Sequence, residues 1–145
     1  HHFLSVNKEG GASHYTSAGN ETAHIILRGG TSGTNYDEKS IGQTCDKLES
    51  DGLIPKVMVD FSHANSQKKF KNQLLVGEDI AQQIKSGSEN IFGVMIESNL
   101  FEGNQSVDSL DSLKYGVSIT DSCLGWDDTK PLLELLASAV KEKNS

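Results

Sequence analysis

Four short apolar segments alternate with longer segments of helical periodicity, and this alternation constrains the fold more than any other feature of the chain. The strand-like segments span residues 3–6, 24–27, 57–59 and 91–96. The helix-like segments span residues 37–50, 67–86 and 129–143. Strands that are apolar throughout are typical of parallel sheets whose faces are covered. The order β-β-α-β-α-β-α therefore predicts an α/β fold with a parallel sheet, and four such strands could form half of an eight-stranded barrel.

The segments between these elements carry turn and capping signals. Residues 7–22 are rich in Gly, Ser, Thr and Asn and are expected to form a loop or hairpin, whereas residues 98–128 form a long polar segment. Asp51-Gly52 and Gly87 are expected to end the first two helices. The third helix is expected to start at a capping side chain, supplied by Asp127, Asp128 or Thr129.

Charge and composition exclude several classes of function. The chain of 145 residues has a net charge of −7 and no basic tract, which argues against nucleic acid and anionic membranes as partners. No apolar run approaches the roughly 20 residues of a membrane span, and no signal peptide is recognisable. The two cysteines, Cys45 and Cys123, lack metal-type spacing and are expected to be reduced thiols in a cytoplasmic protein.

Distinctive polar residues follow the predicted strands at the points where the strands end. Arg28, His63 and Glu97 end successive strands, and Asp121 lies in the long polar segment. Imidazole and carboxylate ligands suit a divalent transition metal, and an arginine nearby suits a phosphate or carboxylate. Each residue also has an ordinary structural interpretation, as a hydrogen-bonded loop residue, a solvated acid or a turn residue. Their joint placement at strand ends keeps the functional interpretation open.

The local sequences around these residues resemble consecutive blocks of the type I 3-deoxy-D-arabino-heptulosonate-7-phosphate (DAHP) synthases, in the microbial branch regulated by aromatic amino acids. The blocks follow the order of that family and cover nearly the whole chain. They are His24-Ile-Ile-Leu-Arg-Gly-Gly30, Asn35-Tyr36, Val57-Met-Val-Asp-Phe-Ser-His-Ala-Asn65, Gly93-Val-Met-Ile-Glu-Ser-Asn99, Glu102-Gly-Asn-Gln-Ser106, Tyr115-Gly-Val-Ser-Ile-Thr-Asp-Ser-Cys123 and Gly125-Trp126.

The resemblance implies that residues 1–145 are the C-terminal half, strands five to eight, of a (β/α)8 barrel. Such enzymes condense phosphoenolpyruvate with erythrose 4-phosphate and release phosphate, the first step of the shikimate pathway. The family's divalent metal (Mn, Fe, Co or Zn) has Cys, His, Glu and Asp ligands, of which His63, Glu97 and Asp121 match three. His63 and Asp121 are also expected to contact the substrates, and Arg28 matches an arginine that binds the phosphate of phosphoenolpyruvate.

The same resemblance implies that the Cys ligand and further basic residues belong to an N-terminal half. His1-His2 and the following residues resemble the fifth-strand segment, so the chain is expected to start within a longer protein. In the family that segment contributes to the pocket for an aromatic amino acid inhibitor, which Phe3 and Ser5 are expected to line. The isolated chain is expected to be inactive, and to associate with the N-terminal half or with a second copy through unpaired edges at residues 3–6 and 91–96.

Three other functions remain open at this level. A 3-deoxy-octulosonate-8-phosphate synthase shares the barrel and the phosphoenolpyruvate chemistry, although the Glu102–Ser106 and Tyr115–Trp126 blocks favour the DAHP branch. A non-catalytic structural or regulatory fragment would need no complete ligand set. A generic metal- or phosphate-binding α/β module would require the motif matches to be accidental.

Overall fold

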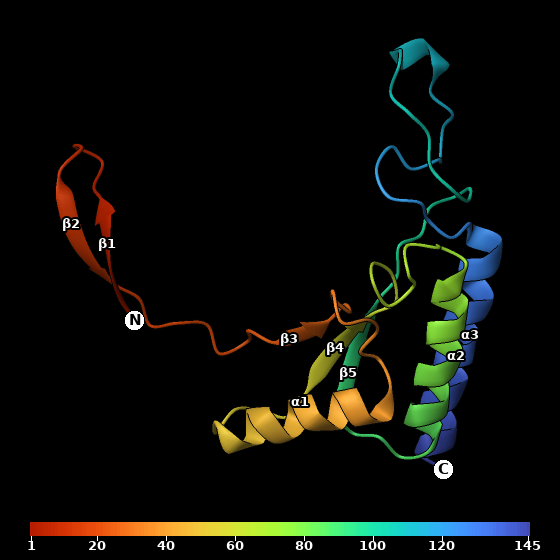
Figure 1. Ribbon diagram of the computed structural model, residues 1–145, viewed down its shortest axis with the longest axis horizontal. Coiled ribbons are helices and arrows are strands. Elements are labelled where there is room, and N and C mark those ends of the chain that lie inside the picture. The colour runs from red at the N-terminus through yellow and green to blue at the C-terminus, as the bar shows by residue number, and fades with distance from the viewer.

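The computed structural model describes residues 1–145 and has a parallel three-stranded sheet at its centre (Figure 1). The sheet order is β3 (Ile25–Leu27), β4 (Val57–Asp60) and β5 (Ile91–Met95), with β4 in the middle. Val59 lies opposite Leu27 on one side and Val94 on the other. The expected α/β fold with a parallel sheet is therefore confirmed. Because the strands are parallel, their carboxyl ends all meet at one edge of the sheet.

Three helices cover one face of this sheet. They are α1 (Glu38–Ser50), α2 (Asn72–Lys85) and α3 (Trp126–Lys143), of which α2 and α3 pack side by side (Figure 1). Val57 and Val59 on β4 are fully buried in the core that these helices form, whereas Met58 between them is only half-buried. Ile26, the neighbour of Met58 on β3, is 49% exposed. The second face of the sheet is therefore open.

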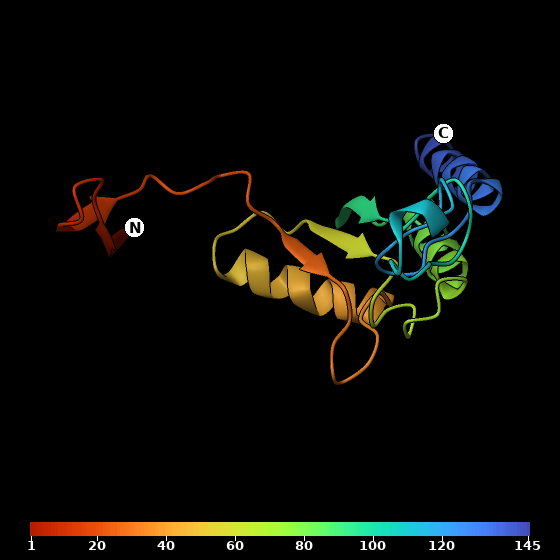
Figure 2. The same cartoon turned by 90° about the horizontal axis from the view of Figure 1, so that it is seen from above.

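The first strand does not belong to this sheet. β1 (His2–Val6) pairs antiparallel with β2 (Ala12–Thr16), and the two views agree that this hairpin lies apart from the other elements (Figures 1 and 2). The expectation of a buried strand at residues 3–6, forming one edge of the parallel sheet, was wrong. A four-residue apolar run does not specify its partner, and here Ala12–Thr16 is the nearest segment able to pair with it. The open edges of the sheet are β3 and β5.

Two helices begin at other residues than the sequence predicts. α2 begins at Asn72 rather than residue 67, because Gln67 and Lys68 have φ of 54° and 58°, in the left-handed region that a helix excludes. α3 begins at Trp126 after Gly125, which makes no side-chain cap, so the expected caps were wrong. The expected helix ends are confirmed, with Asp51-Gly52 ending α1 and Ser86-Gly87 ending α2.

The polar segment between β5 and α3 extends past the carboxyl ends of the strands (Figure 1). It contains one short helix, η1 (Leu110–Ser112), and is closed by backbone bridges of Gly103 with Cys123 and of Asn104 with Ser118. At its base the Lys71 ammonium pairs with Glu102 and, at 2.6 Å, with Asp128. These carboxylates, Asp128 first, raise the pKa of Lys71.

None of the helices has the length and apolar character that crossing a membrane requires.

Candidate metal centre

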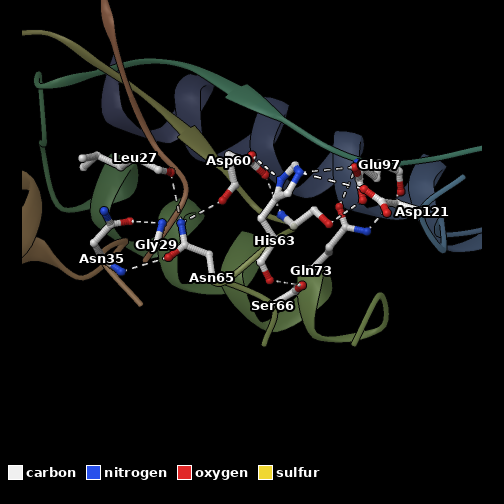
Figure 3. A network of polar contacts seen from close by, with 11 residues as sticks. Leu27, Gly29, Asn35, Asp60, His63, Asn65, Ser66, Gln73, Glu97 and Asp121 are labelled. Atoms are coloured by element: carbon white, nitrogen blue, oxygen red, sulfur yellow. Dashed lines mark hydrogen bonds and ion pairs between the residues drawn. The ribbon is translucent and has the colours of Figure 1, made fainter. Parts of the chain in front are cut away.

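The end of β4 fixes the orientation of His63. Its Nδ1 lies 2.7 Å from Oδ2 of Asp60, a carboxylate whose side chain is only 4% exposed. The other oxygen of Asp60 accepts a hydrogen bond from the backbone N–H of Ser62 at 2.8 Å. Because a carboxylate accepts, Nδ1 is the donor in the neutral ring and Nε2 keeps its lone pair. His63 therefore presents the lone pair of Nε2 at the carboxyl end of the sheet (Figure 3).

Glu97 reaches the same point from the end of β5. The hydroxyl of Ser62 donates to Glu97 Oε2 at 2.6 Å, and Glu97 Oε1 lies 3.9 Å from His63 Nε2. One carboxylate oxygen of Glu97 is thus engaged by the protein, while the other faces the imidazole. A carboxylate with one fixed oxygen has fewer orientations available, which favours a defined ligand geometry.

Asp121 completes the cluster from the long polar segment. Its Oδ2 lies 4.0 Å from His63 Nε2, and its side chain is 70% exposed. Asn104 holds the residues on either side of it, because its amide donates to the carbonyl of Thr120 and its oxygen accepts from the hydroxyl of Ser122, both at 2.9 Å. Asp121 is therefore positioned through its neighbours in the chain.

One ligand atom from each of His63, Glu97 and Asp121 lies within 4.8 Å of the others. Two ligands that are each about 2.0–2.2 Å from one ion are at most about 4.4 Å apart. The spread of the three donor atoms is thus a few tenths of an ångström wider than a single bound divalent cation requires, and the side chains would close by that amount around it. The three residues that the sequence predicted as ligands are brought together, and their binding of metal stays a prediction. Cys45 and Cys123 are both buried and lie outside this cluster, and burial raises the pKa of each thiol.

Arg28 lies beside the cluster because the turns after β3 and β4 are tied together. The carbonyl of Arg28 accepts from the N–H of Ala64 at 3.2 Å and of Asn65 at 3.3 Å, and the buried Asn65 amide donates to Leu27 and Asp60 carbonyls. Gly29 has φ of 70°, and a Cβ there would lie 2.8 Å from Ala64 Cβ. Only glycine fits this close approach. The Arg28 side chain is exposed and forms no ion pair with a carboxylate.

A cavity of about 660 Å³ connects these groups, lined by Arg28, the three clustered side chains and eight further residues. Lys68 and Asn104 are among the lining residues that the sequence did not single out. The signal for Asn104 lay in its motif, Glu102–Ser106, which was used for the resemblance alone. Lys68 was hidden within a predicted helix, although it lies in the turn before α2.

Phe3 and Ser5 are not brought to this cavity. Both lie on β1, where the ring of Phe3 stacks on Tyr15 with centroids 6.0 Å apart, and Ser5 pairs with Ser13. Phe3 is exposed together with Leu4 and Val6. The hairpin therefore offers an apolar surface, separate from the candidate metal centre, and the role of Phe3 and Ser5 in binding an inhibitor stays a prediction.

Comparison with known proteins gives one consistent family. The model of the DAHP synthetase I family matches residues 1–134. The chain is 52% identical over 147 residues to a putative phospho-2-dehydro-3-deoxyheptonate aldolase of Schizosaccharomyces pombe, covering 100% of this chain and 40% of the relative. It is 51% identical over 143 residues to the Phe-sensitive phospho-2-dehydro-3-deoxyheptonate aldolase of Escherichia coli K12, covering 99% and 41%.

A solved structure agrees with the sequence relatives. The phospho-2-dehydro-3-deoxyheptonate aldolase of Francisella tularensis SCHU S4 superposes with a TM-score of 0.89 at 45% identity, over 100% of this chain and 42% of that one. The chain thus spans about two fifths of the length of the curated relatives it matches. With a family model that matches nearly its whole length and relatives about half identical to it, the chain belongs to the DAHP synthetase I family.

Proposed function

We propose that this chain forms part of the active site of a 3-deoxy-7-phosphoheptulonate synthase, which condenses phosphoenolpyruvate with D-erythrose 4-phosphate to give DAHP and phosphate. The observation that carries the proposal is the convergence of His63, Glu97 and Asp121 beside Arg28 in one cavity. The names of the relatives, phospho-2-dehydro-3-deoxyheptonate aldolases, support the same reaction, the first step of the shikimate pathway. The names of the relatives also favour it over a 3-deoxy-octulosonate-8-phosphate synthase, and family membership favours it over a generic binding module.

The residues proposed to hold a divalent ion are His63, Glu97 and Asp121. One imidazole nitrogen and two carboxylate oxygens suit Mn, Fe, Co or Zn. When bound, the ion supplies Lewis-acid polarisation of the acceptor carbonyl or activation of a water. Asp60 keeps His63 Nε2 turned toward the other two ligands, and Ser62 keeps one Glu97 oxygen occupied.

The cationic side chains of the cavity are proposed to bind the anionic substrates. Arg28, which has a planar fork of donors and no carboxylate partner, is proposed to bind the phosphate of phosphoenolpyruvate. In the reaction, carbon 3 of phosphoenolpyruvate forms a bond to the aldehyde carbon of the acceptor, whose oxygen takes up a proton. Water adds to carbon 2, and the bond from carbon 2 to the phosphate oxygen breaks, so that phosphate leaves and a keto group remains. Arg28 orients phosphoenolpyruvate for that attack. Asp121 is proposed to contact an acceptor hydroxyl as well. The predicted hydrogen bond from His63 to a substrate phosphate would need a proton on Nε2, because Nδ1 faces Asp60, so that bond and metal binding by Nε2 exclude each other.

The open sheet supports a larger assembly. The sheet has unpaired edges at β3 and β5 and an open face that includes Ile26, so part of its apolar surface lacks a covering layer. We propose that the chain completes a (β/α)8 barrel with a segment equivalent to the rest of its relatives, or pairs with a second copy. Light scattering of the purified chain tests this, because a well-behaved monomer would contradict it.

The β1–β2 hairpin is proposed to take part in regulation by an aromatic amino acid, through Phe3 and Ser5. Relatives include enzymes named Phe-sensitive and Trp-sensitive in Escherichia coli. Addition of phenylalanine, tyrosine or tryptophan should shift the NMR resonances of the Tyr15 ring, which stacks on Phe3. No change with any of the three would argue against this role.

Phosphate release from phosphoenolpyruvate and erythrose 4-phosphate, with Mn²⁺ present, tests the proposed reaction. Arabinose 5-phosphate is the control acceptor, and its preferential use would identify the octulosonate reaction instead. The assay should be run on this chain alone and on the chain joined to a segment equivalent to the rest of its relatives. We expect metal binding by both and turnover by the second only. The same rate from the isolated chain would refute the need for more than these residues.

A further inference from the structure

Glu97 is held by its backbone as well as by its carboxylate. β5 ends at Met95, so the peptide groups of Glu97 lie beyond the ladder that β5 forms with β4. The N–H of Glu97 donates to Gln73 Oε1 at 2.8 Å, and its carbonyl accepts from Gln73 Nε2 at 3.0 Å (Figure 3). Two directly opposed residues of antiparallel strands exchange hydrogen bonds in this reciprocal way. The side-chain amide of Gln73 therefore takes the place of a neighbouring strand.

Gln73 can make this contact because of where α2 lies. It occupies the first turn of α2 and is fully buried, with 0% exposure. One turn later, Gly77 allows the helix to approach Phe61 and Leu132, since a Cβ at Gly77 would lie 2.3 Å from Leu132 Cδ1. If Glu97 moved away, a buried amide would lose both of its partners, which is costly in free energy. The position of Glu97 relative to α2 is therefore fixed.

The same peptide carbonyl also sets the position of the segment that carries Asp121. The carbonyl of Glu97 accepts a second hydrogen bond, at 2.9 Å, from the N–H of Leu124, which lies three residues after Asp121. Leu124 is fully buried. Gln73, Glu97 and Leu124 are thus joined at the carbonyl of Glu97. The hydrogen bonds at this carbonyl help to position two of the three clustered side chains, Glu97 and Asp121.

We propose that Gln73 is a positioning residue of the metal centre, acting through the backbone of Glu97 to fix where the Glu97 carboxylate meets His63 and Asp121. The inference rests on the proposed metal-binding function of these three residues. Gln73 touches neither the ion nor the substrates in this arrangement. Its effect is on how well the ligands are arranged before the ion arrives, and so on metal affinity and ligand geometry.

The test replaces Gln73 with methionine, which has similar length and volume but neither hydrogen-bonding group. Co²⁺ serves as the probe, because its visible absorption reports both binding and ligand geometry. Loss of a group that orients a ligand typically weakens metal binding about 10- to 100-fold, so we expect the Co²⁺ Kd of Gln73→Met to rise by that factor. The absorption of the saturated variant should also differ in position or intensity.

Two controls separate positioning from general stability. Gln82→Met makes the same chemical change on the same helix at an exposed residue, and Ile84→Val trims the buried core away from Glu97. Both should keep the Co²⁺ Kd and spectrum of the unsubstituted protein. If circular dichroism shows that Gln73→Met does not fold, Gln73→Asn, which withdraws the amide by one methylene, carries the same test.

The outcomes are distinct. Unchanged affinity and spectrum in a folded Gln73 variant would overturn the inference, as would an equal loss of affinity in Ile84→Val. If the unsubstituted protein itself binds no Co²⁺, the proposed metal centre fails, and the positioning role fails with it. A raised Co²⁺ Kd in the Gln73 variants, with an unchanged Kd in Gln82→Met and Ile84→Val, supports the inference.

Discussion

Asp60 Oδ2 lies 2.7 Å from His63 Nδ1, and this contact leaves Nε2 facing Glu97 and Asp121. A carboxylate behind a ligand imidazole selects the tautomer and fixes the ring plane. Asp60 itself is buried at the end of β4, where its second oxygen is engaged by the backbone of Ser62. The orientation of the His63 ring is thus set by the last residue of β4 and the turn that follows it.

Asp60→Asn should therefore weaken metal binding without unfolding the protein. The asparagine oxygen can still accept from the N–H of Ser62, but its NH₂ group faces Nδ1 and opposes the donor tautomer. We expect the Kd for Mn²⁺ or Co²⁺ to rise about 10- to 100-fold, measured by titration calorimetry. Asp46→Asn, on the outer side of α1, is the matched control and should bind as the unsubstituted protein does. Equal affinities for Asp60→Asn and Asp46→Asn would contradict the role given to Asp60.

Arg28→Ala should raise the KM for phosphoenolpyruvate in a catalytically competent protein that carries this chain. Loss of a charge-assisted hydrogen-bonding partner of about 1.5–3 kcal/mol corresponds to roughly a 10- to 100-fold effect. Arg28→Lys keeps the charge but not the planar fork, so its KM should lie between those of the unsubstituted protein and Arg28→Ala. Initial rates at varied phosphoenolpyruvate and saturating erythrose 4-phosphate give the constants. An unchanged KM in Arg28→Ala would remove Arg28 from the phosphate site.

Gly77→Ala and Gly42→Ala should change stability in opposite directions. Gly77 lies against Phe61 and Leu132, where an added Cβ comes within 3.0 Å of Phe61 Cε2 and closer still to Leu132, so overpacking should cost about 1–3 kcal/mol. Gly42 lies within α1 and has no atom within 4 Å of an added Cβ, so alanine there should stabilise by up to about 1 kcal/mol. Urea unfolding of both variants measures the difference. Equal shifts would show that the close approach of α2 to Phe61 and to α3 is not required.

The contribution of Asp37 to the free energy of unfolding should decrease in acid. Its side chain caps α1, and hydrogen bonds from the Ser40 hydroxyl and then the Ser40 N–H hold the pKa of Asp37 below the usual range of an aspartate. A lowered folded-state pKa gives stability that is present above the unfolded value and is lost as the pH falls through the folded one. Because the group is largely exposed, the contribution is small.

Comparison of Asp37→Asn with Asp37→Ala separates the charge from the cap. Asparagine caps about as well as aspartate, whereas alanine costs about 1 kcal/mol at neutral pH. The stability difference between the unsubstituted protein and Asp37→Ala should therefore shrink below about pH 4, the ordinary range of an aspartate. Chemical unfolding at pH 7 and pH 3 measures it, and a difference independent of pH would contradict the assignment.

The sequence was sufficient for the parallel sheet and for the meeting of His63 and Glu97, because both follow from strand order, whereas Asp121 lies in the long polar segment and only its motif predicted that it joins them. Polar residues at the carboxyl ends of neighbouring parallel strands must gather at one edge. Apolar periodicity was not sufficient for residues 3–6, because their pairing partner lies in a polar segment whose composition predicts only a loop or hairpin.

Two other features depend on contacts that no local pattern encodes. Lys68 has a left-handed backbone conformation, and its N–H donates to the carbonyl of His63. This turn prevents α2 from starting at residue 67. Gln73 is a polar residue on the inner face of α2, and its partner is a backbone 24 residues away. From periodicity alone, a glutamine at that position is an exception to the apolar face rather than part of a site.

Recognition of Glu97 by Gln73 has a consequence for redesign of the centre. The amide of Gln73 contacts only main-chain atoms at position 97, so it is indifferent to which side chain that position carries. A carboxylate, an imidazole or a thiolate could be exchanged there while the supporting backbone stays in place. If the proposed centre binds a metal, substitutions at position 97 should change which ion it prefers while the backbone that Gln73 supports stays in place.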